Sequence, residues 1–79
     1  MPSVEIYTMS YCPYCIAAKR LLKKLGWQFN EIEITGKPKV KTTMVQRTQR
    51  RTVPQIFVNN QHIGGFDDFS AYVQEQKLL

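Results

Sequence analysis

The feature that most constrains this chain is a pair of cysteines, Cys12 and Cys15, placed between a strand-like and a helix-like segment. Residues 4–8 alternate between apolar and polar side chains and are rich in strand formers. Residues 16–25 repeat apolar side chains on one helical face, and Gly26 follows as a helix-ending residue. A Cys-x-x-Cys pair that opens the helix of a βαβ unit indicates dithiol redox chemistry.

The rest of the chain continues the alternation of strand and helix patterns. The further predicted elements are a strand over 28–34, a helix over 39–49 with Pro38 in its first turn, a strand over 55–58, a strand around 62–63 after the turn Asn59-Asn60, and a helix opened by Asp67-Asp68. A right-handed βαβ unit makes the first two strands parallel, and the hairpin adds an antiparallel pair. We therefore predict an α/β fold of order β-α-β-α-β-β-α, with a four-stranded mixed sheet flanked on both faces by three helices.

Length and cysteine content restrict the class of protein. A chain of 79 residues predicts a single domain over 1–79. No signal peptide is visible, and no apolar stretch approaches the ~20 residues that a membrane span needs. A bridge between two cysteines so close in sequence would constrain the unfolded chain very little, so a structural role is a poor explanation for it. These features predict a cytoplasmic protein that does not bind membranes.

The chain is basic, with 11 Lys and Arg against 6 Asp and Glu and a net charge of +5. Such an excess attracts nucleic acid or other anions, although a solvated basic face is the simpler explanation. Arg47, Arg50 and Arg51 have no aromatic stacking platform or RNA-binding signature beside them. We therefore expect no nucleic-acid partner.

The position of Cys12 at the start of a helix favours its thiolate. A free thiol has a pKa of ~8.5, and only the thiolate is a nucleophile. The helix dipole contributes at most ~2 kcal/mol, so hydrogen bonds from main-chain N–H groups must supply most of the stabilisation. We expect these donors to be the N–H groups of Tyr14 and Cys15, since Pro13 has none. Cys15 is expected to be shielded, with a pKa closer to that of a free thiol.

Metal binding is the alternative use of two such cysteines. A structural zinc site needs four ligands, and beyond the two cysteines the chain offers only His62 as a soft ligand. We therefore expect no metal. An iron–sulfur cluster shared between two chains and glutathione remains an alternative, although Pro13 should stiffen the loop against it.

Three stretches of the sequence, taken together, resemble the dithiol glutaredoxins, especially the short bacterial type. They are Cys12-Pro13-Tyr14-Cys15, Thr52-Val53-Pro54-Gln55 and Gly64-Gly65-Phe66-Asp67-Asp68. The resemblance implies a thioredoxin-like fold and a glutathione-dependent disulfide oxidoreductase of cellular electron transport and redox homeostasis. It also implies glutathione as co-substrate, glutathionylated or disulfide-containing proteins as substrates, and a monomer. A redoxin reduced directly by thioredoxin reductase is the nearest rival.

The resemblance assigns roles to individual residues. It implies Cys12 as the nucleophile, Cys15 as the resolving thiol, and a cis peptide bond before Pro54 that exposes the Val53 backbone to glutathione. Asp67 and Asp68 would cap the last helix and hold the γ-glutamyl end. The implied glutathione-binding residues are Tyr14, Thr52, Val53, Pro54, Gly65, Asp67 and Asp68.

One position departs from the pattern of the family. Glutaredoxins usually carry Lys or Arg three residues before the first cysteine, where this chain has Met9. We expect another cation, Lys41, Arg47 or the Arg50-Arg51 pair, to contact the glycyl carboxylate of glutathione instead.

Overall fold

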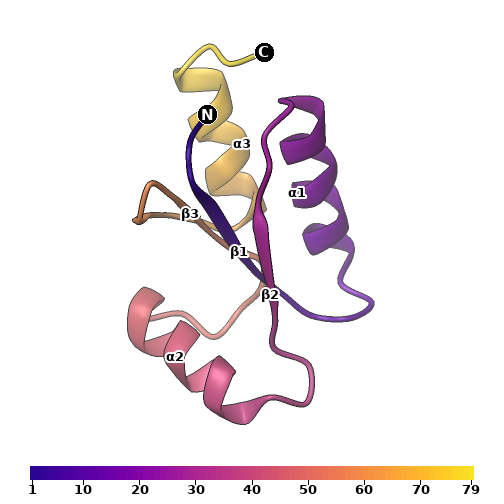
Figure 1. Cartoon of the computed structure of the whole chain (residues 1–79), viewed down its shortest axis with the longest axis vertical. Coiled ribbons are helices and arrows are strands. Elements are labelled where there is room, and N and C mark those ends of the chain that lie inside the picture. The colour runs from indigo at the N-terminus through magenta and orange to yellow at the C-terminus, as the bar shows by residue number, and fades with distance from the viewer.

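The computed structural model describes all residues, 1–79, and its elements follow the predicted order (Figure 1). They are β1 (Val4–Thr8), α1 (Pro13–Lys24), β2 (Asn30–Glu33), α2 (Pro38–Thr48), β3 (Gln55–Val58), β4 (Gln61–Gly64) and α3 (Phe66–Glu75). The sheet has four strands in the order β2-β1-β3-β4. β1 is parallel to β2 and antiparallel to β3, and β3 is antiparallel to β4. The predicted mixed sheet is confirmed.

The two faces of the sheet carry separate apolar cores because neighbouring residues of a strand point to opposite faces. On one face, Ile6 packs with Leu22 of α1 and Phe69 of α3, and all three are fully buried. On the other face, Tyr7 packs with Met44 of α2. Burial of one such side chain contributes ~1.5–3 kcal/mol, so these contacts fix the three helices against the sheet. Figure 1 shows α1 and α3 together, with α2 apart from them.

The start of α3 differs from the prediction. The N-cap is Gly65, and the carboxylate of Asp68 accepts a hydrogen bond from the Gly65 N–H at 3.0 Å. Only this half of a capping box forms, because glycine has no side chain to bond in return. Asp67 makes no capping bond, so the expectation that both aspartates cap the helix is wrong for Asp67. Gly64 has a φ of +127°, and a Cβ there would overlap the Asp68 carboxyl group.

The observed bounds of β2 and α2 differ by one or two residues from the predicted ones. β2 covers only the middle of the predicted strand. α2 ends at Thr48, because Gln49 adopts a left-handed conformation with a φ of 58°. Asn59 and Asn60 have φ values of 50° and 66°, which is the backbone of a tight hairpin turn.

The topology brings distant segments of the chain to one end of the sheet. β1 and β2 are parallel, so the loop from β1 to α1 lies at their carboxyl ends. Figure 1 shows the starts of α1 and α3 at the same end of the sheet, the end nearer α2. No helix has the length and the apolar character that a membrane span requires.

Candidate active site

Cys12 is the N-cap of α1 and is half-buried. Its sulfur accepts a hydrogen bond from the Cys15 N–H at 3.2 Å, and its thiol faces the Val53 carbonyl oxygen at 3.9 Å. The expected second donor, the Tyr14 N–H, makes no hydrogen bond to this sulfur. Side chains at the N-cap bond to the second or third amide of the helix, and here the third amide takes the sulfur. One main-chain donor therefore stabilises negative charge on Cys12, instead of the two that were expected.

Cys15 is a buried thiol, with 1% of its surface exposed. Its burial, followed by its hydrogen bond with Cys12, raises the pKa of Cys15 to about 12. The expectation that this pKa is close to that of a free thiol is wrong, because desolvation disfavours the charged form of the group. Cys15 thus stays protonated at neutral pH.

A groove of about 290 Å³ lies beside the cysteines. Eight residues line it, namely Tyr14, Thr52, Val53, Pro54, Gly65, Phe66, Asp67 and Asp68. All seven residues that the resemblance assigned to glutathione are among them. The peptide bond between Val53 and Pro54 is cis, as the resemblance implied. A Cβ on Gly65 would stand 3.4 Å from the Pro54 carbonyl oxygen, so these two segments of the groove wall lie in van der Waals contact range.

Gln55 anchors one wall of the groove, a role that sequence analysis missed. Its side chain is fully buried, and its Nε2 donates to the Thr52 carbonyl oxygen at 3.0 Å and to the Thr52 hydroxyl at 3.2 Å. Its Oε1 accepts from His62 Nε2 at 2.7 Å. Burial, and then the cation of Arg50, lower the pKa of His62. A neutral His62 therefore supports the Thr52 segment through Gln55. The only sequence signal was a polar residue within a buried apolar strand.

Phe66 is the second residue that sequence analysis missed. Its ring lies 6.4 Å from the ring of Tyr14, measured between centroids, and both line the groove. Tyr14 is 63% exposed. The two rings form an apolar side to a groove whose other residues are largely polar or main-chain atoms. Phe66 belongs to the stretch Gly64-Gly65-Phe66-Asp67-Asp68, but an aromatic residue at a helix start is equally typical of core packing.

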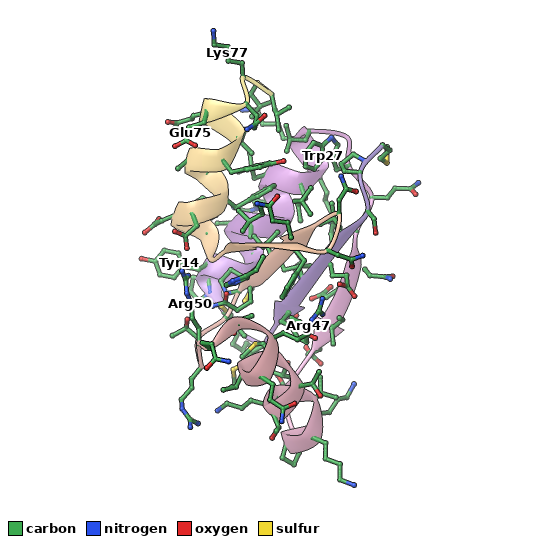
Figure 2. All side chains as sticks on the ribbon, turned by 90° about the vertical axis from the view of Figure 1, so that its left-hand side faces the viewer. Tyr14, Trp27, Arg47, Arg50, Glu75 and Lys77 are labelled. Atoms are coloured by element: carbon green, nitrogen blue, oxygen red, sulfur yellow. The ribbon has the colours of Figure 1, made fainter.

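The basic candidates have different surroundings. Arg47 donates to Glu5 Oε1 and to the Tyr7 hydroxyl, each at 3.0 Å, and its guanidinium carbon lies 3.9 Å from the centre of the Phe57 ring. Figure 2 shows Arg47 between α2 and the sheet. Arg47 lines no part of the groove, and its guanidinium is held against the sheet by Glu5 and Tyr7. The prediction that it contacts glutathione therefore has no support.

Lys41 is the candidate cation that lies beside Met9. It lines a hollow of about 250 Å³ together with Met9. It also lines a second hollow, together with Arg51. Of the candidate cations, Lys41 is the one that shares a surface with Met9.

Arg50 pairs with a groove residue. Its Nη1 lies 2.8 Å from Asp68 Oδ2. The Arg50 guanidinium, followed by the Gly65 N–H, lowers the pKa of Asp68. Asp68 is therefore a carboxylate at neutral pH, fixed between an amide and a cation at one end of the groove.

The side chains of the chain form no group of three or more His, Cys, Asp or Glu residues that could hold a metal ion. His62, the only candidate third ligand to the cysteines, is bonded to Gln55 on β3.

Comparisons with known proteins agree with the geometry. The family profile described as "Glutaredoxin" matches residues 4–63. The chain is 45% identical to a glutaredoxin of Pseudomonas aeruginosa over 78 residues, covering 99% of this chain and 93% of the relative. It is 51% identical to glutaredoxin 3 of Escherichia coli K12 over 71 residues, covering 90% of this chain and 86% of the relative.

A solved structure shares the same architecture. The crystal structure of a buckwheat glutaredoxin–glutathione complex superimposes with a TM-score of 0.87 at 30% identity, covering 98% of this chain and 73% of that one. The fold is therefore thioredoxin-like. With its Cys12 and Cys15 pair at the start of α1, the chain belongs to the glutaredoxin family, the glutathione-dependent thiol–disulfide oxidoreductases.

Proposed function

We propose that the groove beside Cys12 binds glutathione, with its sulfur at Cys12 and its γ-glutamyl end at the start of α3. The observation that carries this proposal is that all seven residues expected to bind glutathione line one groove. The buckwheat relative was solved as a glutathione complex, which supports the same use of the groove here. The Val53 main chain would pair with the cysteinyl part of glutathione.

The proposed substrates are protein–glutathione mixed disulfides. The Cys12 thiolate attacks the glutathione sulfur, the mixed disulfide bond breaks, and the protein leaves as a thiolate that takes up a proton. Cys12 is then joined to glutathione. A second glutathione thiolate attacks the glutathione sulfur of this intermediate, forms oxidised glutathione and releases the Cys12 thiolate. A stabilised Cys12 thiolate is the better leaving group in this last step.

Protein disulfides require both cysteines. Cys12 attacks one sulfur of the substrate disulfide, the substrate S–S bond breaks, and the other substrate sulfur leaves as a thiolate that takes up a proton. Cys12 is then joined to the attacked sulfur in a mixed disulfide. Cys15 gives up its proton and attacks the Cys12 sulfur, the mixed disulfide breaks, the second substrate thiolate leaves and takes up a proton, and a Cys12–Cys15 bridge remains. Two glutathiones reduce that bridge. Because Cys15 is buried and protonated in the reduced protein, it reacts only after Cys12 has formed the mixed disulfide, when loss of the Cys12 thiolate removes a nearby negative charge.

The experiment compares wild type with Cys12→Ser and Cys15→Ser in glutathione-coupled assays. Cys12→Ser should abolish turnover of every substrate. Cys15→Ser should retain reduction of a small glutathione mixed disulfide and lose reduction of a protein disulfide. Retained turnover in Cys12→Ser would refute the proposal. Equal turnover of wild type with thioredoxin reductase in place of glutathione would favour the rival redoxin.

The same proposal includes the setting in which the enzyme works. We expect residues 1–79 to act as one glutaredoxin domain, as a monomer, in the cytoplasm, without a metal or a nucleic-acid partner. Light scattering at several concentrations tests the oligomeric state. Anaerobic purification with iron, sulfide and glutathione tests the cluster-carrier alternative, which a brown, dimeric product would establish.

A further inference from the structure

The hydrogen bonds of Gln55 lead from the groove to His62 on β4, a residue that lines no part of that groove. We propose that His62 is a positioning residue for glutathione binding: its Nε2–H orients the Gln55 amide, and that amide holds the Thr52 segment in the conformation that receives glutathione. This inference rests on the proposed glutathione groove. It adds to that groove a residue from outside its lining.

The segment over 50–54, which forms one wall of the groove, has no main-chain partners of its own. None of its residues makes a main-chain to main-chain hydrogen bond. Side chains bond its main chain instead. The Thr48 hydroxyl bonds to its first residue, and Gln55 Nε2 donates to the Thr52 carbonyl oxygen. The Cys12 thiol contact to the same segment is long, at 3.9 Å. The position of Thr52 therefore depends on the Gln55 side chain.

The Gln55 amide can take only one orientation. Its Nε2 donates to the Thr52 carbonyl oxygen at 3.0 Å and to the Thr52 hydroxyl at 3.2 Å. If the amide turned over, its Oε1 would face the Thr52 carbonyl oxygen, and two acceptors would repel each other. Oε1 points instead to His62 Nε2, at 2.7 Å. The neutral His62 ring therefore carries its proton on Nε2, because an unprotonated Nε2 would meet Oε1 as a second acceptor.

Burial makes the hydrogen bond from His62 necessary. Gln55 is fully buried, so solvent does not reach its Oε1. No buried side-chain nitrogen or oxygen of the protein lacks a partner. Without the His62 donor, Oε1 would be left unsatisfied, and a buried acceptor without a partner is costly. The amide would then turn toward another donor and release the Thr52 carbonyl oxygen.

The sheet fixes the His62 ring in place. His62 pairs with Phe57 across β3 and β4, and the centroids of the two rings lie 5.1 Å apart. Gln55 lies two residues before Phe57 on β3, and residues at this spacing share a face of the sheet. Cross-strand pairs also share a face, so all three side chains lie together. A rigid part of the fold thus holds a wall that has no regular structure.

A purely structural role for this network is the alternative. It can be separated from a positioning role because a buried polar pair can be replaced by apolar groups of similar shape at little cost in stability. Gln55→Met combined with His62→Phe is such a replacement. The apolar pair fills the same space but cannot bond the Thr52 carbonyl oxygen.

The experiment measures steady-state kinetics with a glutathionylated peptide, and urea denaturation of the same variants. His62→Phe keeps a flat ring and removes the donor, so the KM should rise about three- to tenfold with kcat unchanged, as for the loss of one hydrogen bond to a buried group. His62→Gln offers an amide N–H at a similar reach and should restore most of the wild-type KM. The double variant should regain stability relative to His62→Phe, whereas its KM should stay raised.

Two further measurements make the result specific. Gln61→Leu changes the neighbouring exposed residue of β4 and should leave the KM unchanged. Nitrogen-15 NMR of the neutral His62 ring in wild type should place the proton on Nε2.

Four results would each overturn the proposal. They are an unchanged KM in His62→Phe, an equal KM in His62→Gln and His62→Phe, recovery of both stability and KM in the double variant, and a proton on Nδ1 of the neutral ring. Failure of the glutathione groove itself would look different. Wild type would then show the same KM for the peptide whether its cysteine carried glutathione or cysteamine.

Discussion

The main-chain N–H of Cys15 donates to the sulfur of Cys12 across 3.2 Å, while the thiol of Cys15 is almost completely buried. Cys15 therefore has opposite effects on the ionisation of the two thiols. Its amide stabilises a thiolate on Cys12, and its own burial keeps its proton in place. The two cysteines are chemically unequal before any substrate binds.

This inequality predicts selective alkylation. With the pKa of Cys15 raised to about 12, roughly one Cys15 in a thousand is ionised at pH 9. Iodoacetamide should therefore modify only Cys12 in the reduced, folded protein between pH 6 and 9, and both cysteines after denaturation. Peptide mass spectrometry of samples quenched over time measures the two rates. Comparable labelling of both cysteines at pH 8 in the folded state would contradict the buried geometry.

Lys41 should compensate for Met9. Because the two residues line one hollow, we expect Lys41→Gln to raise the KM for glutathione about three- to tenfold, as for the loss of one exposed charge contact. Adding Met9→Lys to this variant should restore the KM. Lys39→Gln, on the same helix but outside the hollow, is the matched control. If Lys39→Gln has the same effect, only the general positive charge matters.

Arg47 should affect stability and not binding. Its contacts with Glu5, Tyr7 and Phe57 hold α2 on the sheet. Loss of the cation–π contact and of the partly exposed ion pair in Arg47→Gln should lower the free energy of unfolding by about 1–2 kcal/mol. Urea denaturation measures that change, and steady-state kinetics should show the wild-type KM for glutathione. A raised KM for glutathione in Arg47→Gln would mean that Arg47 does contribute to glutathione binding.

Glu31 should make the stability depend on pH. The hydroxyl of Thr8, followed by Lys19, lowers the pKa of Glu31 below its ordinary value of 4.5. A lowered pKa in the folded state means that the stabilisation is present above pH 4.5 and is lost as the pH falls through the folded value. Glu31→Gln should lower the free energy of unfolding at pH 7 by about 0.5–1 kcal/mol, the small size reflecting solvent screening.

The control for this experiment is Glu75→Gln, which removes a carboxylate that forms no ion pair. Denaturation curves for the three proteins should be recorded at pH 7 and at steps below pH 4.5. The difference between wild type and Glu31→Gln should shrink with acidification. A constant difference would mean that the Glu31 contacts act through packing alone.

Much of this architecture was predictable because local patterns and global fold agree. The alternation of apolar and polar residues in 4–8 predicts a strand, and the helical spacing of apolar residues after Cys15 predicts a helix. The order of such strands and helices along the chain is compatible with only a few sheet topologies. The residues that line the groove could be predicted only from the family resemblance. No local pattern indicates that Val53 and Gly65 meet beside Cys12.

The details that were missed depend on contacts between distant segments. Asp67 and Asp68 are equivalent in sequence, and only the exact start of α3 selects Asp68 to bond the Gly65 amide. Arg47 and Arg50 are likewise similar, yet one turns to the sheet and the other to α3. The acidity of Cys15 depends on how completely the assembled fold covers it, which its neighbours in sequence do not reveal.

β2 is an outer strand of the sheet, and its outward side chains are mostly acidic. Glu31 and Glu33 point to one side of it, anchored by Lys19 and by Ser10. A second chain that added its own β2 along this border would bring four carboxylates together. Like charges at an exposed border oppose such growth of the sheet. Glu33, which accepts a hydrogen bond from Ser10 in the loop before Cys12, and Glu31 therefore also discourage edge-to-edge pairing between sheets of two chains.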